Sequence, residues 1–283
     1  MALLLIVSVI WAFSFGLIKH YLAGVDSAFV AATRLGLAFV VFLPLLRWKG
    51  LGLRTGVVLA AIGAVQFGFM YLTYIESFRY LHAYEAALFT ITTPILVTLF
   101  ADALDRRLRP RALLAALLAV IGTALVTVQS TSLNLTLHGL ALVQLSNAAF
   151  AVGQIAYKRL RAARPGLRDR EVFALLYAGA FAVAAIALVQ RNATVTLHAA
   201  QLWTLGYLGI VAAGLGFFLW NVGATKVGAG TLAVMNNAKV PLAVVVSLVV
   251  FHEQAKVGWL TASLAVMGTA VWIAEYRPAG SRG

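Results

Sequence analysis

The sequence predicts an all-α integral membrane protein with ten transmembrane helices, arranged as two inverted five-helix repeats around a central cavity. The first observation is composition: 62% of the 283 residues are hydrophobic and 11% are charged, and the mean hydropathy is +0.93. Soluble domains carry about 25% charged residues. The second is a duplication, in which Pro94 and its surroundings recur around Pro241, 147 positions later. An odd number of spans per copy inverts the second copy in the bilayer.

Ten apolar segments are long enough to cross a bilayer, which takes roughly 20 mostly apolar residues. The first segment begins at Met1 without a basic leader and carries Lys19 near its far end. It is also longer than the apolar part of a signal peptide, so it is predicted to be a retained span. In chain order the segments cover about 2–22, 27–46, 56–78, 82–102, 111–130, 137–157, 172–190, 203–224, 229–250 and 257–275.

The lysines and arginines separate between the two sets of alternate loops. One set, which includes the loops around Lys49, Arg107 and Arg164, holds 16 of the 22, and the other set holds four. By the positive-inside rule the richer side is cytoplasmic, which places both termini in the cytoplasm and the chain in the cell (inner) membrane. The net charge of +13 therefore indicates topology, and no nucleic-acid partner is expected.

The duplication extends beyond the two proline-containing spans. VIGTALV at 120–126 matches VMGTAVW at 266–272, and WAFSFGLIK at 11–19 resembles FAVGQIAYK at 150–158. The offsets between the paired segments differ by only a few residues, as differences in loop length produce. The predicted repeats are residues 1–130 and residues 131–283.

Several of these motifs occur in an order known from a transporter family. Trp11 lies in the first span and Arg34 in the second; YLHAYEAALFTITTP, DALDRRLRP and VIGTAL follow, and GYLGIVAAGLGFFLWNVGATKVGAG, KVPLAVVV and FHEQ repeat the order. Over nearly the whole chain this resembles the ten-span EamA-type members of the drug/metabolite transporter superfamily. The resemblance implies a carrier of amino acids, other metabolites or toxic compounds, often outward. The family's usual Gly-Glu before spans 5 and 10 reads Leu-Asp at 104–105 and His-Glu at 252–253, in a loop outside the cavity.

Lys239 is the strongest candidate for a substrate-binding residue. It lies ten residues into the ninth span, which is about 15 Å at 1.5 Å per residue, and a charge at that depth usually faces the bundle interior or a wet cavity. Pro241 cannot donate a hydrogen bond to the carbonyl of Asn237 and is expected to kink the helix. Asn236 shares a helical face with Lys239. The alternative is a structural lysine that pairs with an internal carboxylate.

Pro94 marks the equivalent place in the fourth span. Thr92 is the counterpart of Lys239 there, and the proline releases the carbonyl of Thr90. Glu85, seven residues before Thr92, shares its helical face. It is predicted either to pair with Lys239 or to carry a coupling proton, although a solvated carboxylate at the interface is the alternative.

Arg34 lies about two turns inside the second span and matches an arginine position of the family. Because arginine does not readily lose its proton, it has to reach carbonyls, a carboxylate or the membrane interface. We expect a structural clamp or charge pair at the outer end, with substrate contact as the alternative.

The resemblance places the aromatic residues of spans 1, 3 and 8 around the cavity. Aromatic walls suit apolar or amphipathic substrates, although such residues also serve as packing or as the interfacial belt. Ser14 could hydrogen-bond the substrate or its own helix backbone. The aromatic candidates for the cavity wall are Trp11, Phe15, Tyr71, Tyr74, Phe217 and Trp220, and Trp11, Tyr71, Tyr74 and Trp220 are predicted to contact the substrate.

Together these features predict a secondary transporter that works by alternating access, with an amino acid or related carboxylate-bearing metabolite as substrate and export as its direction. A multidrug efflux carrier is the main alternative. A membrane-embedded enzyme is disfavoured because the sequence has no HExxH zinc motif and no run of aspartates suited to magnesium. A channel is disfavoured because paired, kinked helices suit alternating access better. No cofactor or metal is expected, and the absence of cysteine excludes thiolate chemistry.

Overall fold

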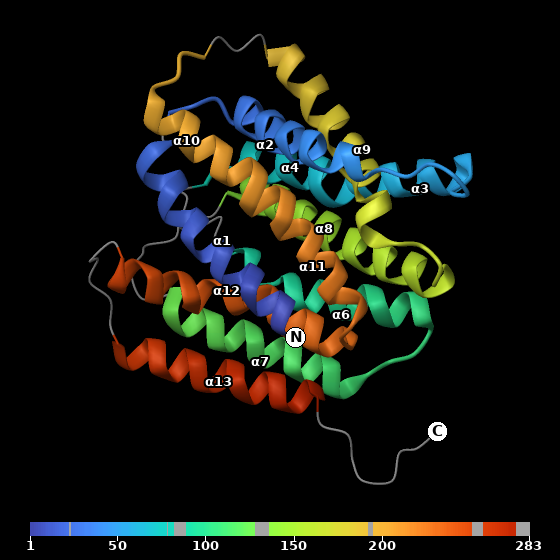
Figure 1. Ribbon diagram of the computed structural model, residues 1–283. Helices are drawn as coiled ribbons and strands as arrows, with labels where there is room; N and C mark the ends of the chain where they lie inside the picture. The colour runs from blue at the N-terminus through green and yellow to red at the C-terminus, as the bar shows by residue number, and fades with distance from the viewer. Residues whose placement is uncertain are drawn as a thin grey trace.

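The computed structural model describes residues 1–22, 24–77, 79–81, 89–127, 136–191, 195–250 and 257–275. These residues form ten helical segments and no strand, five from each half of the chain (Figure 1). The first half contains α1 (Ala2–Tyr21), α2 (Ser27–Phe42) with the short turn η1 (Leu43–Leu45), α3 (Leu53–Gly63) continued by η2 (Ala64–Phe69) and α4 (Met70–Ser77), α6 (Thr93–Asp105) and α7 (Pro110–Thr127). The second half contains α8 (Leu137–Ala163), α9 (Asp169–Arg191), α10 (Ala199–Tyr207) continued by η4 (Leu208–Leu215) and α11 (Gly216–Thr225), α12 (Ala229–Val249) and α13 (Val257–Glu275).

Several helices begin or end at residues whose chemistry favours that boundary. The Asp26 side chain accepts a hydrogen bond from the backbone N–H of Phe29 at 2.9 Å and caps the start of α2. Pro110 is the first residue of α7, a position where its missing N–H costs nothing. Five segments are long and apolar enough to cross a membrane by themselves, and Ala2–Ser14 and Pro110–Leu125 are shorter apolar stretches. The chain is therefore an all-α membrane protein.

The helix contacts of the two halves follow an approximate twofold symmetry. The equivalent helices α7 and α13 pack along each other, as do α2 and α9, and Figure 1 shows the first pair side by side. α1 packs against α11 and α12 of the second half, and α8 packs in the same way against α4 and α6 of the first. Because each half has five spans, the second half runs through the bilayer in the opposite sense. The predicted fold of two inverted repeats is therefore confirmed.

The symmetry extends to local backbone geometry. Both η2 and η4 are π-helical segments inside otherwise α-helical spans. π-Helical turns are rare in proteins as a whole, and many of those that occur are at functional sites. Gly63 and Gly68, directly before and within η2, match Gly209 and Gly214 within η4 with an offset of 146 in both cases. The duplicated segments thus share an unusual backbone conformation as well as their apolar pattern.

Two glycines allow α3 and α9 to meet at backbone distance. A Cβ on Gly63 would lie 1.9 Å from the carbonyl oxygen of Leu176, and a Cβ on Gly179 would lie 1.9 Å from the carbonyl oxygen of Ala60. No side chain fits at such distances, so both positions require glycine and the two helices are in direct contact.

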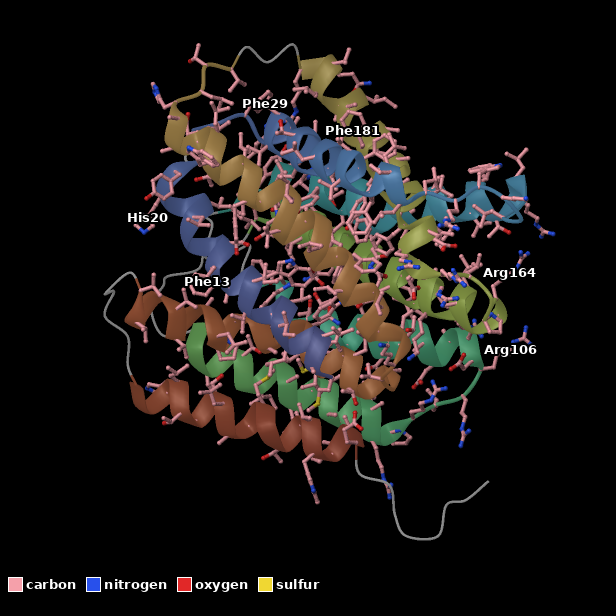
Figure 2. The ribbon with its side chains drawn as sticks, viewed as in Figure 1. Phe13, His20, Phe29, Arg106, Arg164 and Phe181 are labelled. Carbon is pink, nitrogen blue, oxygen red and sulfur yellow. The ribbon has the colours of Figure 1, made fainter. Side chains whose placement is uncertain are left out.

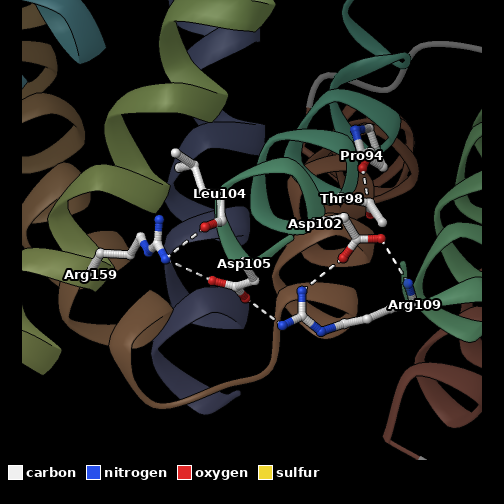
Figure 3. A network of polar contacts seen from close by, with 7 residues as sticks. All are labelled: Pro94, Thr98, Asp102, Leu104, Asp105, Arg109 and Arg159. Carbon is white, nitrogen blue, oxygen red and sulfur yellow. Dashed lines mark hydrogen bonds and ion pairs between the residues drawn. The ribbon is translucent and has the colours of Figure 1, made fainter. Parts of the chain in front are cut away.

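The basic loops gather at one end of the bundle, which we call the arginine-rich end. Figure 2 shows Arg106 and Arg164 there, with His20 at the other side of the molecule. Arg109 donates to Asp102 at 2.7 Å through its guanidinium and at 2.9 Å through its backbone N–H, and it also pairs with Asp105 (Figure 3). Arg159 of the second half bonds to Asp105 at 3.0 Å. This network ties the two halves together at the arginine-rich end.

Candidate functional site

A cavity of about 150 Å³ lies between the two halves of the bundle. It occupies the part away from the arginine-rich end, since its α8 residues and its Arg34 come from the first halves of α8 and α2. Both halves of the chain contribute to its wall, and the described wall carries two cations and no carboxylate. The lining residues are Trp11, Ser14, Ile18, Arg34, Met70, Tyr71, Tyr74, Thr90, Thr93, Ser146, Asn147, Phe150, Phe217 and Lys239.

Lys239 reaches the cavity from the middle of α12, which remains helical through Pro241. Its Nζ lies 5.3 Å from the centre of the Trp11 ring, within the range of a cation–π interaction. None of the described carboxylates forms an ion pair with Lys239. The ammonium can therefore donate hydrogen bonds to a ligand in the cavity.

Arg34 reaches the same cavity from α2. The residue is only 6% exposed, and its guanidinium carbon lies 4.9 Å from the centre of the Tyr71 ring. The cavity therefore has a second cation over a second aromatic ring.

Aromatic rings form an apolar floor between the two cations. The Phe217 ring centre lies 5.5 Å from that of Trp11 and 6.0 Å from that of Tyr71. Phe150 adds a ring 6.2 Å from Trp11. Trp11 is fixed by a 2.9 Å hydrogen bond from its Nε1 to the carbonyl of Ala212 in η4, so a π-helical segment positions one of the cavity's rings.

An interrupted helix forms another side of the cavity, since helix gives way to a turn at residues 91–92 and α6 begins at Thr93. Side chains from other helices satisfy the carbonyls exposed by this break. Asn147 donates to the carbonyl of Phe89 at 2.9 Å, and Asn237 donates to that of Ile91 at 2.8 Å. Broken helices at the interface of repeats commonly accompany transporter binding sites.

A second polar cluster, which we call the amide cluster, lies between the cavity and the arginine-rich end. Gln154 accepts a 2.9 Å hydrogen bond from Nε1 of Trp220 and exchanges contacts of 3.4–3.5 Å with Asn236. Gln66 donates to Asn221 at 3.2 Å. These five side chains are all fully or almost fully buried, so they close the bundle beyond the cavity floor.

The structure brings together seven of the residues predicted for the site and places four elsewhere. The cavity is lined by Lys239, Arg34, Trp11, Ser14, Tyr71, Tyr74 and Phe217, and the Ser14 hydroxyl donates to the carbonyl of Ile10 in its own helix. The Phe15 side chain lies outside the described part of the chain. Outside the lining, Asn236 and Trp220 belong to the amide cluster, and Asn237 and Thr92 take part in hydrogen bonds around the helix break. Pro94 lies in the first turn of α6 and Pro241 inside α12. Glu85 lies outside the described residues.

The sequence reasoning missed Phe150, Ser146 and Asn147. The match of segment 11–19 to segment 150–158 already pairs Phe150 with Trp11, so the repeat could have identified it. Ser146 and Asn147 are polar residues in an apolar span, which is itself a signal of function.

Known proteins resemble this chain in both sequence and fold. The "Biotin transporter" of Salmonella typhimurium and that of Escherichia coli (strain K12) are each 43% identical over 277 residues, which is 96% of this chain and 92% of each relative. A "Probable biotin transporter" of Pseudomonas aeruginosa is 44% identical over 96% of both chains. A solved crystal structure shares the fold with a TM-score of 0.81 at 20% identity, and covers 97% of this chain and 96% of that one.

The sequence model of the EamA-like transporter family matches the chain twice, over residues 1–128 and residues 137–274. The two matches together cover most of the chain. With the relatives, they indicate a transporter of small metabolites, not an enzyme. The chain therefore belongs to the EamA-like transporter family.

Proposed function

We propose that this protein transports biotin, or a close analogue that carries a single carboxylate, across the membrane by alternating access. The observation that carries the proposal is Lys239, a cation at mid-membrane that lines the cavity without a described carboxylate partner. The names of relatives at 43–44% identity support biotin as that anion. They do not support the amino acid expected from the sequence, although biotin keeps the predicted carboxylate.

The chemistry of biotin suits the described wall. Biotin has a carboxylate on an apolar chain, and at its other end a cyclic urea fused to a thioether ring. The aromatic floor of Trp11, Phe150 and Phe217 supplies apolar area for the chain and the ring. A carboxylate beside Lys239 would compensate a charge that is costly to bury alone.

The repeats give a structural basis for alternating access. We propose residues 1–130 and 131–283 as the two units that exchange conformations, because inverted repeats around a midplane site can interchange their packing. In the proposed orientation, with both termini cytoplasmic, the arginine-rich end faces the cytoplasm and the amide cluster closes that side. The cavity then lies on the outer side of the closure. Export and coupling to a proton stay predictions, which transport assays in both directions address.

The test is binding and counterflow of radiolabelled biotin with purified protein in liposomes. Lys239→Met keeps the approximate length of the side chain but removes its charge, so we expect biotin affinity to fall at least about tenfold, as lost charge-assisted hydrogen bonds do. Lys226→Met, at an exposed position outside the cavity, is the matched control and should bind normally. A wild-type protein that neither binds biotin nor exchanges it across the membrane would refute the proposal.

A further inference from the structure

Arg34 has no structural partner that accounts for its burial. Its Nε is buried without a hydrogen-bond acceptor, and among the described residues its guanidinium makes only the contact with the Tyr71 ring. An unsatisfied buried cation is costly. A cation–π contact offsets only part of that cost.

The clamp expected of Arg34 is formed by another arginine. Arg191 pairs with Glu76 and lies 3.9 Å from a carboxylate oxygen of Asp26. Glu76 also pairs with Arg79 at 2.8 Å. The described carboxylates at this end of the bundle are therefore already engaged by arginines other than Arg34.

The two cations of the cavity stand at different places along the aromatic floor. Lys239 lies over Trp11 and Arg34 over Tyr71, with Phe217 between those rings. This arrangement suits a ligand that has one oxygen acceptor at each end and an apolar body between them.

We propose that Arg34 is a second substrate-binding residue, which donates hydrogen bonds to the oxygen acceptor at the end of the substrate opposite its carboxylate. This inference rests on the proposed function, under which the acceptor is the carbonyl of the cyclic urea. The planar guanidinium offers several N–H donors in a fixed geometry, and no acceptor for them occurs in the described part of the chain. Lys239 selects for the anion and Arg34 selects for the urea, so a simple fatty acid satisfies only one of the two cations.

Biotin and biotin amide, in which the carboxylate is replaced by a neutral carboxamide, separate the two roles. We expect Arg34→Gln to lower the affinity for both ligands by a similar factor of about ten, which corresponds to the loss of one charge-assisted hydrogen bond. Lys239→Met should lower the affinity for biotin much more than the affinity for biotin amide, because the neutral carboxamide loses only an uncharged hydrogen bond. Arg79→Gln, the same substitution at an exposed arginine near the same end, should leave both affinities unchanged.

Two results would overturn the assignment of Arg34. One is that Arg34→Gln binds biotin with wild-type affinity. The other is that Arg34→Gln binds biotin more weakly but binds biotin amide with wild-type affinity, since that result would place both cations at the carboxylate. If Arg34→Gln does not fold, Arg34→Lys keeps the charge and removes the guanidinium geometry, and it should still weaken biotin amide; unchanged affinity would count against the proposal. Absence of biotin binding by the wild type is a separate result, which refutes the proposed function instead.

Discussion

Lys239 stands over Trp11, with its Nζ 5.3 Å from the centre of the indole ring. The same indole donates its N–H to the carbonyl of Ala212 in η4. Trp11 thus connects a charge in the middle of α12 with a π-helical segment. A ligand that binds Lys239 changes the electrostatic environment of the indole directly.

This contact predicts an optical signal for substrate binding. Because Trp11 is the tryptophan in the cavity wall, biotin should change the intrinsic fluorescence of the wild-type protein. Trp11→Phe should remove most of that change and weaken binding several-fold, since tryptophan gives the strongest cation–π interaction. Trp259→Phe, at a position 47% exposed, should keep the signal in a fluorescence titration. A full signal in Trp11→Phe would show that the substrate does not approach this ring.

The contact between α3 and α9 predicts two positions that do not tolerate a methyl group. Gly63→Ala and Gly179→Ala each place a Cβ against a backbone carbonyl, and the rigid neighbour forces the helices apart. We expect each to destabilise the fold by about 1–3 kcal/mol, as overpacked cores do, and to lower the melting temperature. Gly206→Ala, on α10 with open space around it, is the control and should be neutral or slightly stabilising.

The ion pairs at the arginine-rich end predict a stability difference that depends on pH. The hydrogen bond from Arg109 holds the pKa of the Asp105 carboxylate below its usual value. A lowered folded-state pKa stabilises the protein above the unfolded pKa, about 4, and this stabilisation is lost as the pH falls through the folded value. Asp105→Asn should therefore have a lower melting temperature than the wild type at pH 7. The difference between the two melting temperatures should shrink below about pH 4. A gap that is constant with pH would exclude a charge effect.

The separation of basic residues predicts the orientation in the membrane. Reporters fused after Gly283 or within residues 164–168 should be active only in the cytoplasm, and a reporter within residues 131–136 should be active only outside. The physical reason is the excess of lysine and arginine in alternate loops. A C-terminal reporter that reads outside would contradict the orientation and, with it, the assignment of the cavity to the outer side.

Much of the fold was predictable because the span and repeat signals are strong. The predicted span 56–78 corresponds to Leu53–Ser77, and the predicted span 257–275 corresponds to α13. α8 extends to Ala163, past the predicted end at 157, because Arg161 continues the helix and bonds to Asp169 at 2.6 Å. Apolar length marks where a span crosses the hydrocarbon layer, and charged residues can prolong the helix beyond it.

The site was less predictable, because depth along a helix does not give the direction in which a side chain points. Lys239 was found from charge and depth, and Trp11 from the family resemblance. Arg34 was expected to clamp the outer end, because nothing in the sequence assigns Glu76 to Arg191. Asn236 was expected beside the substrate, but its amide bonds with Gln154. The pairing of amides between helices depends on their relative rotation, which an apolar pattern does not encode.

The amide cluster has a consequence for how the transport cycle can be driven. Gln66, Gln154, Trp220, Asn221 and Asn236 are neutral, and none of them gains or loses a proton at physiological pH. A transmembrane voltage does work only on charge that moves, so parting these hydrogen bonds is not in itself sensitive to voltage or acidity. In the described cavity wall, the charged groups on which such driving forces can act are Lys239 and Arg34. Under the proposed function, a site that holds one anion with these two cations has a smaller net charge than an empty site, so we expect the return of the empty carrier to be the more voltage-dependent half of the cycle.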